Sequence, residues 1–330
     1  MSKKYGTIAS YGEALIANAE TLVDLGSRSP TIVRDYRQRL ESYCKPFFGD
    51  QSIRTINTKR LREFVRWLSD RGLKATTIQG VLSFVSMTLK LAAEDGVIQA
   101  VPLVPRPSAK DSPRPWLSEA EYKNLLRTLR KLERARPPIL VRDRWPIEIE
   151  LRYFVTFMVH TFLRPGDAFG LTHRHIEIVE EVDRKFLRLS PPTSKTSLSP
   201  IISMPIAVDI YRRLQKRGEK AGYGKPGDYV FLPGYKGRNY AQEIFRRQLS
   251  HAFTAAGIKT SAGGGDRTTY SLRHTAIMFR LIKSDGLDLL TLARNCRTSV
   301  EMIDRFYARH LTAEMNLAKL QSMKHPTRYR

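Results

Sequence analysis

The spacing of apolar residues along the first hundred positions predicts short amphipathic helices. One stripe recurs at i, i+3, i+4 and i+7, the spacing that places side chains on one helical face, and consists of Leu61, Phe64, Val65 and Leu68. A second stripe at helical spacing contains Ile78, Val81, Leu82, Val85 and Leu89. We expect Thr76 to cap this second helix and Gly96 to lie near its end, because threonine accepts hydrogen bonds from first-turn amides and glycine tolerates the left-handed backbone that ends helices.

Two further helices are expected upstream of these stripes. One covers about residues 11–25, and the other runs from Ser29 and Pro30 to about Tyr43. Serine caps a helix, and proline fits the first helical position because its missing N–H would have no partner there. The first hundred residues are therefore predicted to form a domain of four short helices.

A proline-rich stretch separates this domain from the rest of the chain. The segment VPLVPRPSAKDSPRP, residues 101–115, holds five prolines and cannot form a helix or a central strand. We place the first domain at 1–102, the linker at 103–115 and a second domain at 116–330. Ser118 and Glu121 have the spacing of a capping box, which predicts that helices begin there and dominate to about Leu171.

The hydrophobic pattern changes between residues 175 and 205. HIEIV, KFLRLS and PIISMP are short β-like runs separated by turn residues, and they predict a small sheet. Helices resume at about Val208 and continue after the SAGGGD segment (261–266), with a short amphipathic helix expected over 311–321. The predicted fold is mainly α with a small β-sheet: a helical domain followed by an α+β domain.

Charge indicates the kind of partner. The chain has 56 Lys and Arg against 32 Asp and Glu, a formal charge of +24. Residues 1–110 contribute 17 basic against 10 acidic residues, so both parts of the chain are basic. A polyanion is the natural partner, because every neutralised phosphate releases condensed counterions. A merely solubilising basic surface remains the alternative at this point.

Cysteines and apolar runs indicate the compartment. Cys44 and Cys296 form no CxxC pair, which is typical of a reducing compartment and argues against a structural zinc site. No apolar run approaches the ~20 residues that cross a bilayer, and the N-terminus lacks the apolar core of a signal peptide. We therefore expect a cytoplasmic protein with no membrane partner, no metal and no cofactor.

Four segments carry candidate chemistry. In TFLRPGDAFGL, Arg164 precedes a proline that can open a helix, and Asp167 is placed to hold its guanidinium at the helix start. In PPTSKTSLSP, Lys195 is expected at the tip of a hairpin. Each also has an ordinary structural interpretation, as a surface ion pair and as a solvated turn lysine.

The other two segments lie near the C-terminus. In TTYSLRHTAIMFRL, Tyr270, Arg273 and His274 stand at i, i+3 and i+4, so one helical face presents phenol, guanidinium and imidazole together. In CRTSVEMIDRFYARH, Val300 and Ile303 are expected to face a core, with Tyr307 one turn later. A lone tyrosine at such a position is ordinarily structural.

Taken together, the four segments resemble the tyrosine recombinase (phage integrase) family. Arg164 in TFLRPGD looks like the first family arginine, Lys195 in TSKT like the β-hairpin lysine, Arg273 in YSLRHT like the second arginine, and Tyr307 like the nucleophile. The family often has histidine where Tyr270 stands, and histidine or tryptophan where Thr298 stands. These two departures leave the general base and one phosphate donor open.

The resemblance implies a helical, SAM-like core-binding domain that binds DNA and a catalytic domain that carries Tyr307. It implies site-specific recombination or integration, typical of a mobile element, through a covalent 3′-phosphotyrosine and without metal or ATP. The implied partners are double-stranded DNA sites, a homotetramer on DNA joined through the C-terminal helix, and an accessory DNA-bending or directionality factor. The implied setting is a bacterial or phage-encoded, nucleoid-associated protein. A type IB topoisomerase-like nicking-closing enzyme and a DNA-binding regulator without catalysis are the alternatives.

Overall fold

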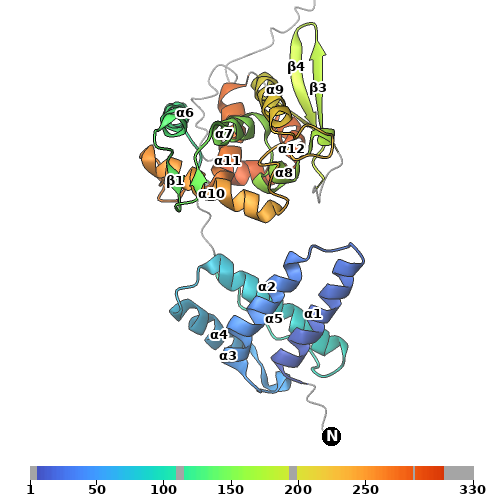
Figure 1. Ribbon diagram of the computed structural model, residues 1–330. Helices are drawn as coiled ribbons and strands as arrows, with labels where there is room; N and C mark the ends of the chain where they lie inside the picture. The colour runs from blue at the N-terminus through green and yellow to red at the C-terminus, as the bar shows by residue number, and fades with distance from the viewer. Residues whose placement is uncertain (1–5, 109–114, 193–198, 285–286, 308–330) are drawn as a thin grey trace, which may run out of the picture. The chain divides into compact units, whose positions relative to one another are not determined.

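The computed structural model describes residues 6–108, 115–192, 199–284 and 287–307, and the chain divides into two compact units, Met1–Lys110 and Asp111–Arg330 (Figure 1). No helix among the described residues is long and apolar enough to cross a membrane. Within the same residues, no group of three or more His, Cys, Asp or Glu side chains is placed to hold a metal ion.

The first unit is built from helices. Its elements are α1 (Ile8–Asp24), α2 (Thr31–Arg39), the π-helical turn η1 (Leu40–Cys44), α3 (Lys45–Phe48), the 3₁₀ turn η2 (Ile53–Thr55), α4 (Thr58–Asp70) and α5 (Ala75–Glu94). The predicted four-helix organisation is confirmed, with the second helix continuing through η1 into α3. Helix α1 packs against both α2 and α5.

Two predicted helix caps in this unit are wrong. Thr76 lies inside α5, because Lys74 already has the extended dihedral angles (φ −67°, ψ 148°) that precede a helix. Ser29 lies one residue before the cap of α2, because Pro30 is the N-cap residue and already has helical angles. Gly96 follows α5 as predicted, with a positive φ of 70° that glycine adopts without strain.

The core of the first unit confirms both apolar stripes. The buried face of α4 consists of Leu61, Phe64 and Leu68, and α5 buries Val85 and Leu89 against it. Each such side chain contributes roughly 1.5–3 kcal/mol when it is fully removed from water. The burial of these faces leaves the polar faces of the helices toward solvent.

The second unit combines helices with two small sheets. Its elements are α6 (Glu119–Arg134), β1 (Leu140–Val141), β2 (Trp145–Pro146), α7 (Ile149–Thr161), α8 (Pro165–Gly170), η3 (His173–His175), β3 (Ile176–Glu181), β4 (Arg184–Leu189), β5 (Ile201–Ile202), α9 (Pro205–Lys220), α10 (Arg238–Ala255), α11 (Thr269–Lys283), α12 (Leu289–Asn295) and α13 (Val300–Tyr307). The Ser118–Glu121 capping box is confirmed. The helix predicted over 311–321 lies outside the described residues.

The predicted sheet is present as three antiparallel strands in the order β3-β4-β5. Ile176 pairs with Leu189 at one end of the long hairpin, and Leu189 pairs with Ile201 of β5. A second, two-stranded sheet was not predicted, since helices were expected throughout this stretch. In it, Val141 of β1 pairs with Trp145 of β2. Strands of two residues are too short for an alternating pattern to reveal them.

Helix α7 forms the centre of the second unit. It packs against α6, α9 and α11, which surround it in Figure 1. Its side chains are buried on nearly every face, and Phe154 joins an aromatic cluster with Phe169, Phe231 and Phe245. This rigid core holds the C-terminal end of α7, from which the chain enters the candidate site.

Candidate active site

Helix α11 brings three of the predicted site residues together. Tyr270 is 42% exposed, whereas Arg273 and His274 are 4% and 6% exposed. The rings of Tyr270 and His274 have centroids 5.4 Å apart. The helix begins where sequence predicts, because Thr268 caps it and shares a capping box with Ser271. The helical spacing therefore produces the expected cluster of phenol, guanidinium and imidazole.

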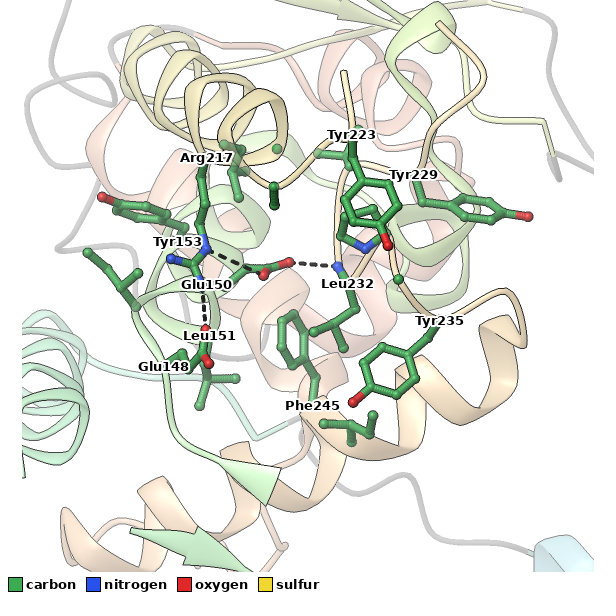
Figure 2. A pocket seen from close by; sticks show the side chains of 18 of the residues that line it. Glu148, Glu150, Leu151, Tyr153, Arg217, Tyr223, Tyr229, Leu232, Tyr235 and Phe245 are labelled. Carbon is green, nitrogen blue, oxygen red and sulfur yellow. Dashed lines mark hydrogen bonds and ion pairs between the residues drawn. The ribbon is translucent and has the colours of Figure 1, made fainter. Parts of the chain in front are cut away.

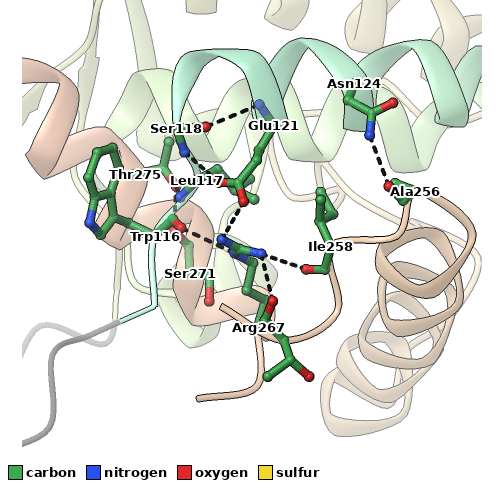
Figure 3. A network of polar contacts seen from close by, with 11 residues as sticks. Trp116, Leu117, Ser118, Glu121, Asn124, Ala256, Ile258, Arg267, Ser271 and Thr275 are labelled. Carbon is green, nitrogen blue, oxygen red and sulfur yellow. Dashed lines mark hydrogen bonds and ion pairs between the residues drawn. The ribbon is translucent and has the colours of Figure 1, made fainter. Parts of the chain in front are cut away.

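A buried arginine anchors the start of α11 (Figure 3). Arg267 forms an ion pair with Glu121 at 2.8 Å and donates to the carbonyl oxygens of Trp116 at 3.1 Å and Ile258 at 2.7 Å. Leu117 adds a backbone hydrogen bond to the hydroxyl of Thr275 within α11. These contacts fix the first turn of α11 against the start of α6.

Arg273 is held by backbone carbonyl groups. Its Nη1 donates to the carbonyl of Phe162, and its Nη2 donates to the carbonyl of Cys296 at 2.5 Å. Burial lowers the pKa of Arg273 from its ordinary value, with the nearby Arg164 also lowering it. Carbonyl oxygens carry no net charge, so the positive charge of the guanidinium is available to an anion.

Arg164 lies far from Arg273 in the sequence, in the turn between α7 and α8. Phe162 adopts a left-handed conformation (φ 58°) that ends α7, and Arg164 then caps α8, with Pro165 at the first helical position. Arg164 Nη2 donates to the carbonyl of Arg297 at 2.5 Å. Its Nη1 lies 3.7 Å from Asp167, which confirms the predicted ion pair.

Tyr307 is the last described residue of α13 and lies against α11. Its hydroxyl is 2.6 Å from Nδ1 of His274, and the two ring centroids are 5.6 Å apart. Tyr307 is 7% exposed. A phenol at this distance from an imidazole nitrogen can pass its proton to that nitrogen when the ring is protonated at Nε2.

The predicted residues line one cavity of about 420 Å³. Its wall includes Arg164, Tyr270, Arg273, His274, Thr298 and Tyr307. Asp167 does not line the cavity but is paired with Arg164, and Lys195 lies outside the described residues. Six of the eight predicted site residues therefore meet at one surface, although α8, α11 and α13 are far apart in sequence.

The sequence did not predict the part that Arg297 plays beside the site. Arg297 is 5% exposed and has a left-handed backbone (φ 50°), and its carbonyl accepts the hydrogen bond from Arg164. Burial lowers its pKa, while Asp167 opposes that change. No sequence motif indicates this role, because Arg297 acts through its backbone carbonyl group and through contacts with residues that are distant in sequence.

The charges around the cavity favour an anion. Among the described residues, Arg164, Arg273 and Asp266 line the cavity, and Arg297 and Asp167 lie next to Arg164, so three guanidinium groups stand against two carboxylates. Planar guanidinium groups bind phosphate oxygens in a bidentate geometry. The site therefore has the chemistry to bind a phosphodiester beside a phenol and an imidazole.

A larger cavity of about 720 Å³ lies elsewhere in the second unit (Figure 2). Arg217 contacts both Glu148 and Glu150 there, and Glu150 accepts a hydrogen bond from the amide of Leu232 at 2.6 Å. Burial raises the pKa of Glu150. The two carboxylates are paired with Arg217, and none of the residues predicted for the site lines this cavity, so size alone does not make it the reactive site.

Comparisons with known proteins give a family match within the first unit and structural matches that cover both units. The family model described as phage integrase, N-terminal SAM-like domain, matches residues 19–94. Among curated proteins, none matches the chain. The Tn1549 transposon integrase in complex with a circular intermediate DNA has a TM-score of 0.65 at 13% identity, covering 96% of this chain and 99% of that chain.

Structures of lambda integrase are similar as well. A lambda integrase tetramer bound to a Holliday junction has a TM-score of 0.63 at 15% identity, covering 90% of this chain and 79% of that chain. Lambda integrase bound to DNA has a TM-score of 0.58 at 14% identity, covering 84% and 88%. The predicted fold class is confirmed by these likenesses.

Proposed function

We propose that the chain is a recombinase of the tyrosine (phage integrase) family, which its fold and its N-terminal domain resemble, and that it recombines DNA at specific sites by cutting and rejoining strands through Tyr307. The observation that carries the proposal is the 2.6 Å contact between Tyr307 and His274 in a cavity that Arg164 and Arg273 also line. The groups proposed as nucleophile, proton acceptor and anion-binding residues therefore lie beside one another.

In the proposed reaction, the phenol oxygen of Tyr307 attacks the scissile phosphorus while its proton passes to Nδ1 of His274. The bond from phosphorus to the 5′ oxygen breaks, leaving a 3′-phosphotyrosine and a free 5′-hydroxyl. Arg164 and Arg273 bind the non-bridging oxygens, where negative charge builds up in the transition state. Attack by a 5′-hydroxyl on the phosphotyrosine reverses the steps and rejoins the strand without ATP or metal.

Three further residues complete the proposed site. Lys195 protonates the departing 5′ oxygen, because an alkoxide is otherwise a poor leaving group. Tyr270 and Thr298 line the cavity, where we expect them to contact the phosphate. Tyr270 stands where the family often has a histidine, and the neighbouring His274 takes over as the proton acceptor.

The first unit supplies part of the proposed DNA-binding surface. Lys59, Arg62 and Arg66 are exposed along one face of α4, opposite its buried apolar stripe. Among the described residues, none of the three takes part in an ion pair, whereas Arg60 on the same helix is bound to Glu63. Unpaired cations in a row on a helix are suited to the phosphates of duplex DNA.

Assembly and setting follow the family resemblance. We propose that the two basic domains, 1–102 and 116–330, bind duplex DNA together, joined by the linker over 103–115. Four copies then assemble on DNA through the C-terminal segment, with an accessory DNA-bending or directionality factor as a further partner. The proposed setting is the cytoplasm of a bacterium, with the gene carried by a phage or another mobile element.

The test is the trapping of a covalent adduct. The substrate is DNA that flanks the gene, nicked near candidate sites so that the short cleaved strand diffuses away and religation is prevented. It is incubated with the protein in the presence of a metal chelator and without ATP. We expect an SDS-stable protein–DNA adduct and, with two intact sites, recombinant product. Adduct without recombinant product would favour a nicking-closing enzyme. DNA binding without adduct would favour a regulator and contradict the proposal.

A further inference from the structure

The two arginines of the candidate site are held by one tight turn. Cys296 follows α12, and its carbonyl accepts from Arg273 Nη2, while the carbonyl of the next residue, Arg297, accepts from Arg164 Nη2. Both bonds are 2.5 Å long. Two successive carbonyl oxygens therefore set the places of both guanidinium groups.

The turn is the hydrogen-bonded end of α12. The amide of Thr298 donates to Ala293 and the amide of Arg297 donates to Arg294, both at 3.0 Å, the pattern of a Schellman motif. In this motif the residue at the position of Arg297 is left-handed and is usually glycine. Arg297 occupies it with φ 50°, a conformation that persists in a side-chain-bearing residue when the surroundings over-determine it.

The side chain of Arg297 supplies such surroundings. Its Nε and Nη2 donate to the carbonyl of Ser199 at 3.0 and 2.8 Å. Two positions earlier, the amide group of Asn295 exchanges hydrogen bonds of 2.8 and 3.0 Å with the backbone of Ile202. Both side chains fasten the turn to the chain around β5, so that the turn cannot rotate independently of the sheet.

We propose that Arg297 is a positioning residue whose guanidinium locks the turn and thereby aims Arg164 and Arg273 at the scissile phosphate. This inference rests on the proposed function for the identity of the anion, but the locking itself is a property of the free protein. Glycine would satisfy the backbone at this position, and it would leave the turn without the anchor to Ser199.

The test compares Arg297→Gly with Arg297→Lys and with the control Arg294→Ala. Glycine keeps the left-handed backbone and both carbonyl groups while it removes the guanidinium. Lysine restores one donor toward Ser199. Arg294 is exposed at the end of the same helix, so its replacement controls for changes in helix and charge.

Cleavage is measured on a phosphodiester and on a DNA with a neutral methylphosphonate at the scissile position, where correct arginine placement matters less. Because small misplacements cost up to ~100-fold, we expect Arg297→Gly to cleave the phosphodiester about 10- to 100-fold more slowly than wild type, with Arg297→Lys in between. On the methylphosphonate we expect the variants to match wild type. An equal loss on both substrates would mean a role in folding alone and would overturn the inference.

A second measurement needs no cleavage. The guanidinium N–H signals of Arg164 and Arg273, assigned by their loss in the lysine variants, report by NMR how fast those protons exchange with water. We expect faster exchange in Arg297→Gly and unchanged exchange in Arg294→Ala. Unchanged exchange in Arg297→Gly would overturn the inference. If Arg297→Gly exchanges faster but the wild-type protein forms no adduct with DNA, the inference about Arg297 is retained and the proposed function is contradicted.

Discussion

The hydroxyl of Tyr307 lies 2.6 Å from Nδ1 of His274, although 33 positions separate the two residues. The contact joins α13 to the first turns of α11. In the proposed reaction it is the path by which the phenol loses its proton, so the imidazole has a chemical role in addition to its packing against the tyrosine ring.

We expect His274→Ala to slow cleavage by roughly 10²–10⁴-fold, the usual contribution of a positioned general base. The loss should shrink as pH rises, because free phenols ionise near pH ~10 and hydroxide can then produce the phenolate without a base. Single-turnover adduct formation between pH 6 and about 9.5 checks this. A ratio of wild-type to variant rate that stays constant across this range would count against proton transfer to His274.

The arginine pair is expected to act on the transition state. Replacing Arg164 or Arg273 with lysine leaves one ammonium that cannot hold its carbonyl and the phosphate together. Cleavage at saturating DNA should fall by about 10²–10³-fold, the cost of losing one oxyanion-binding donor, while DNA affinity changes little. Single-turnover rates measured beside filter-binding affinities separate the two effects. Weakened affinity with an unaltered rate would assign these arginines to binding alone.

The basic face of α4 is expected to contribute binding and not chemistry. Replacing Arg62 and Arg66 with alanine should weaken DNA binding, and the log–log salt slope should decrease by about 0.9 for each phosphate that the variant no longer neutralises. Titrations at several salt concentrations measure this. Arg37→Ala is the matched control, because Arg37 is already paired with Glu20. An unchanged slope in the double variant would exclude this face from the interface.

His160 is expected to make the protein sensitive to acid. Burial lowers the pKa of His160 to about 4, from an ordinary value of 6.5. Below pH 6.5 the imidazole of His160 therefore binds a proton in the unfolded chain, whereas in the folded chain it binds one only near pH 4. The contribution to stability is complete above pH 6.5 and is lost as pH falls to 4, a loss of up to about 3 kcal/mol.

Urea unfolding of the full chain at pH 7, 5.5 and 4.5 measures this loss, with His160→Phe as the variant that lacks the titrating group. The variant should lose less stability over the same range. Parallel pH profiles of the two proteins would show that other groups govern the acid response.

Much of the site followed from sequence because its residues act through side chains at regular spacing. Tyr270, Arg273 and His274 share a face by helical geometry, and Asp167 reaches Arg164 from three positions away. The spacing alone could not show that Tyr307 meets His274, since that contact depends on how α13 packs against α11.

The features that sequence did not predict act through the backbone. The carbonyl groups of Phe162, Cys296 and Arg297 hold the two arginines, and every residue has such a group, so no residue type marks them. The left-handed conformations of Phe162 and Arg297 were hidden because neither residue is a glycine or an asparagine. Likewise, the wrong cap at Thr76 arose because Lys74 caps α5 without any side-chain hydrogen bond.

The central claim is that the hydroxyl of Tyr307 is the nucleophile. Tyr307→Phe removes one oxygen and keeps the buried ring, so folding and DNA binding should persist while adduct formation and strand exchange are lost. Tyr270, exposed in the same cavity, is the rival phenol among the described residues. Tyr270→Phe should retain the adduct. A further rival, Tyr329, lies outside the described residues.

The most direct measurement is to digest the trapped wild-type adduct with protease and identify the DNA-linked peptide by mass spectrometry. The proposed mechanism predicts that DNA is attached to Tyr307. DNA attached to a peptide that lacks Tyr307, whether through Tyr270 or Tyr329, would contradict it.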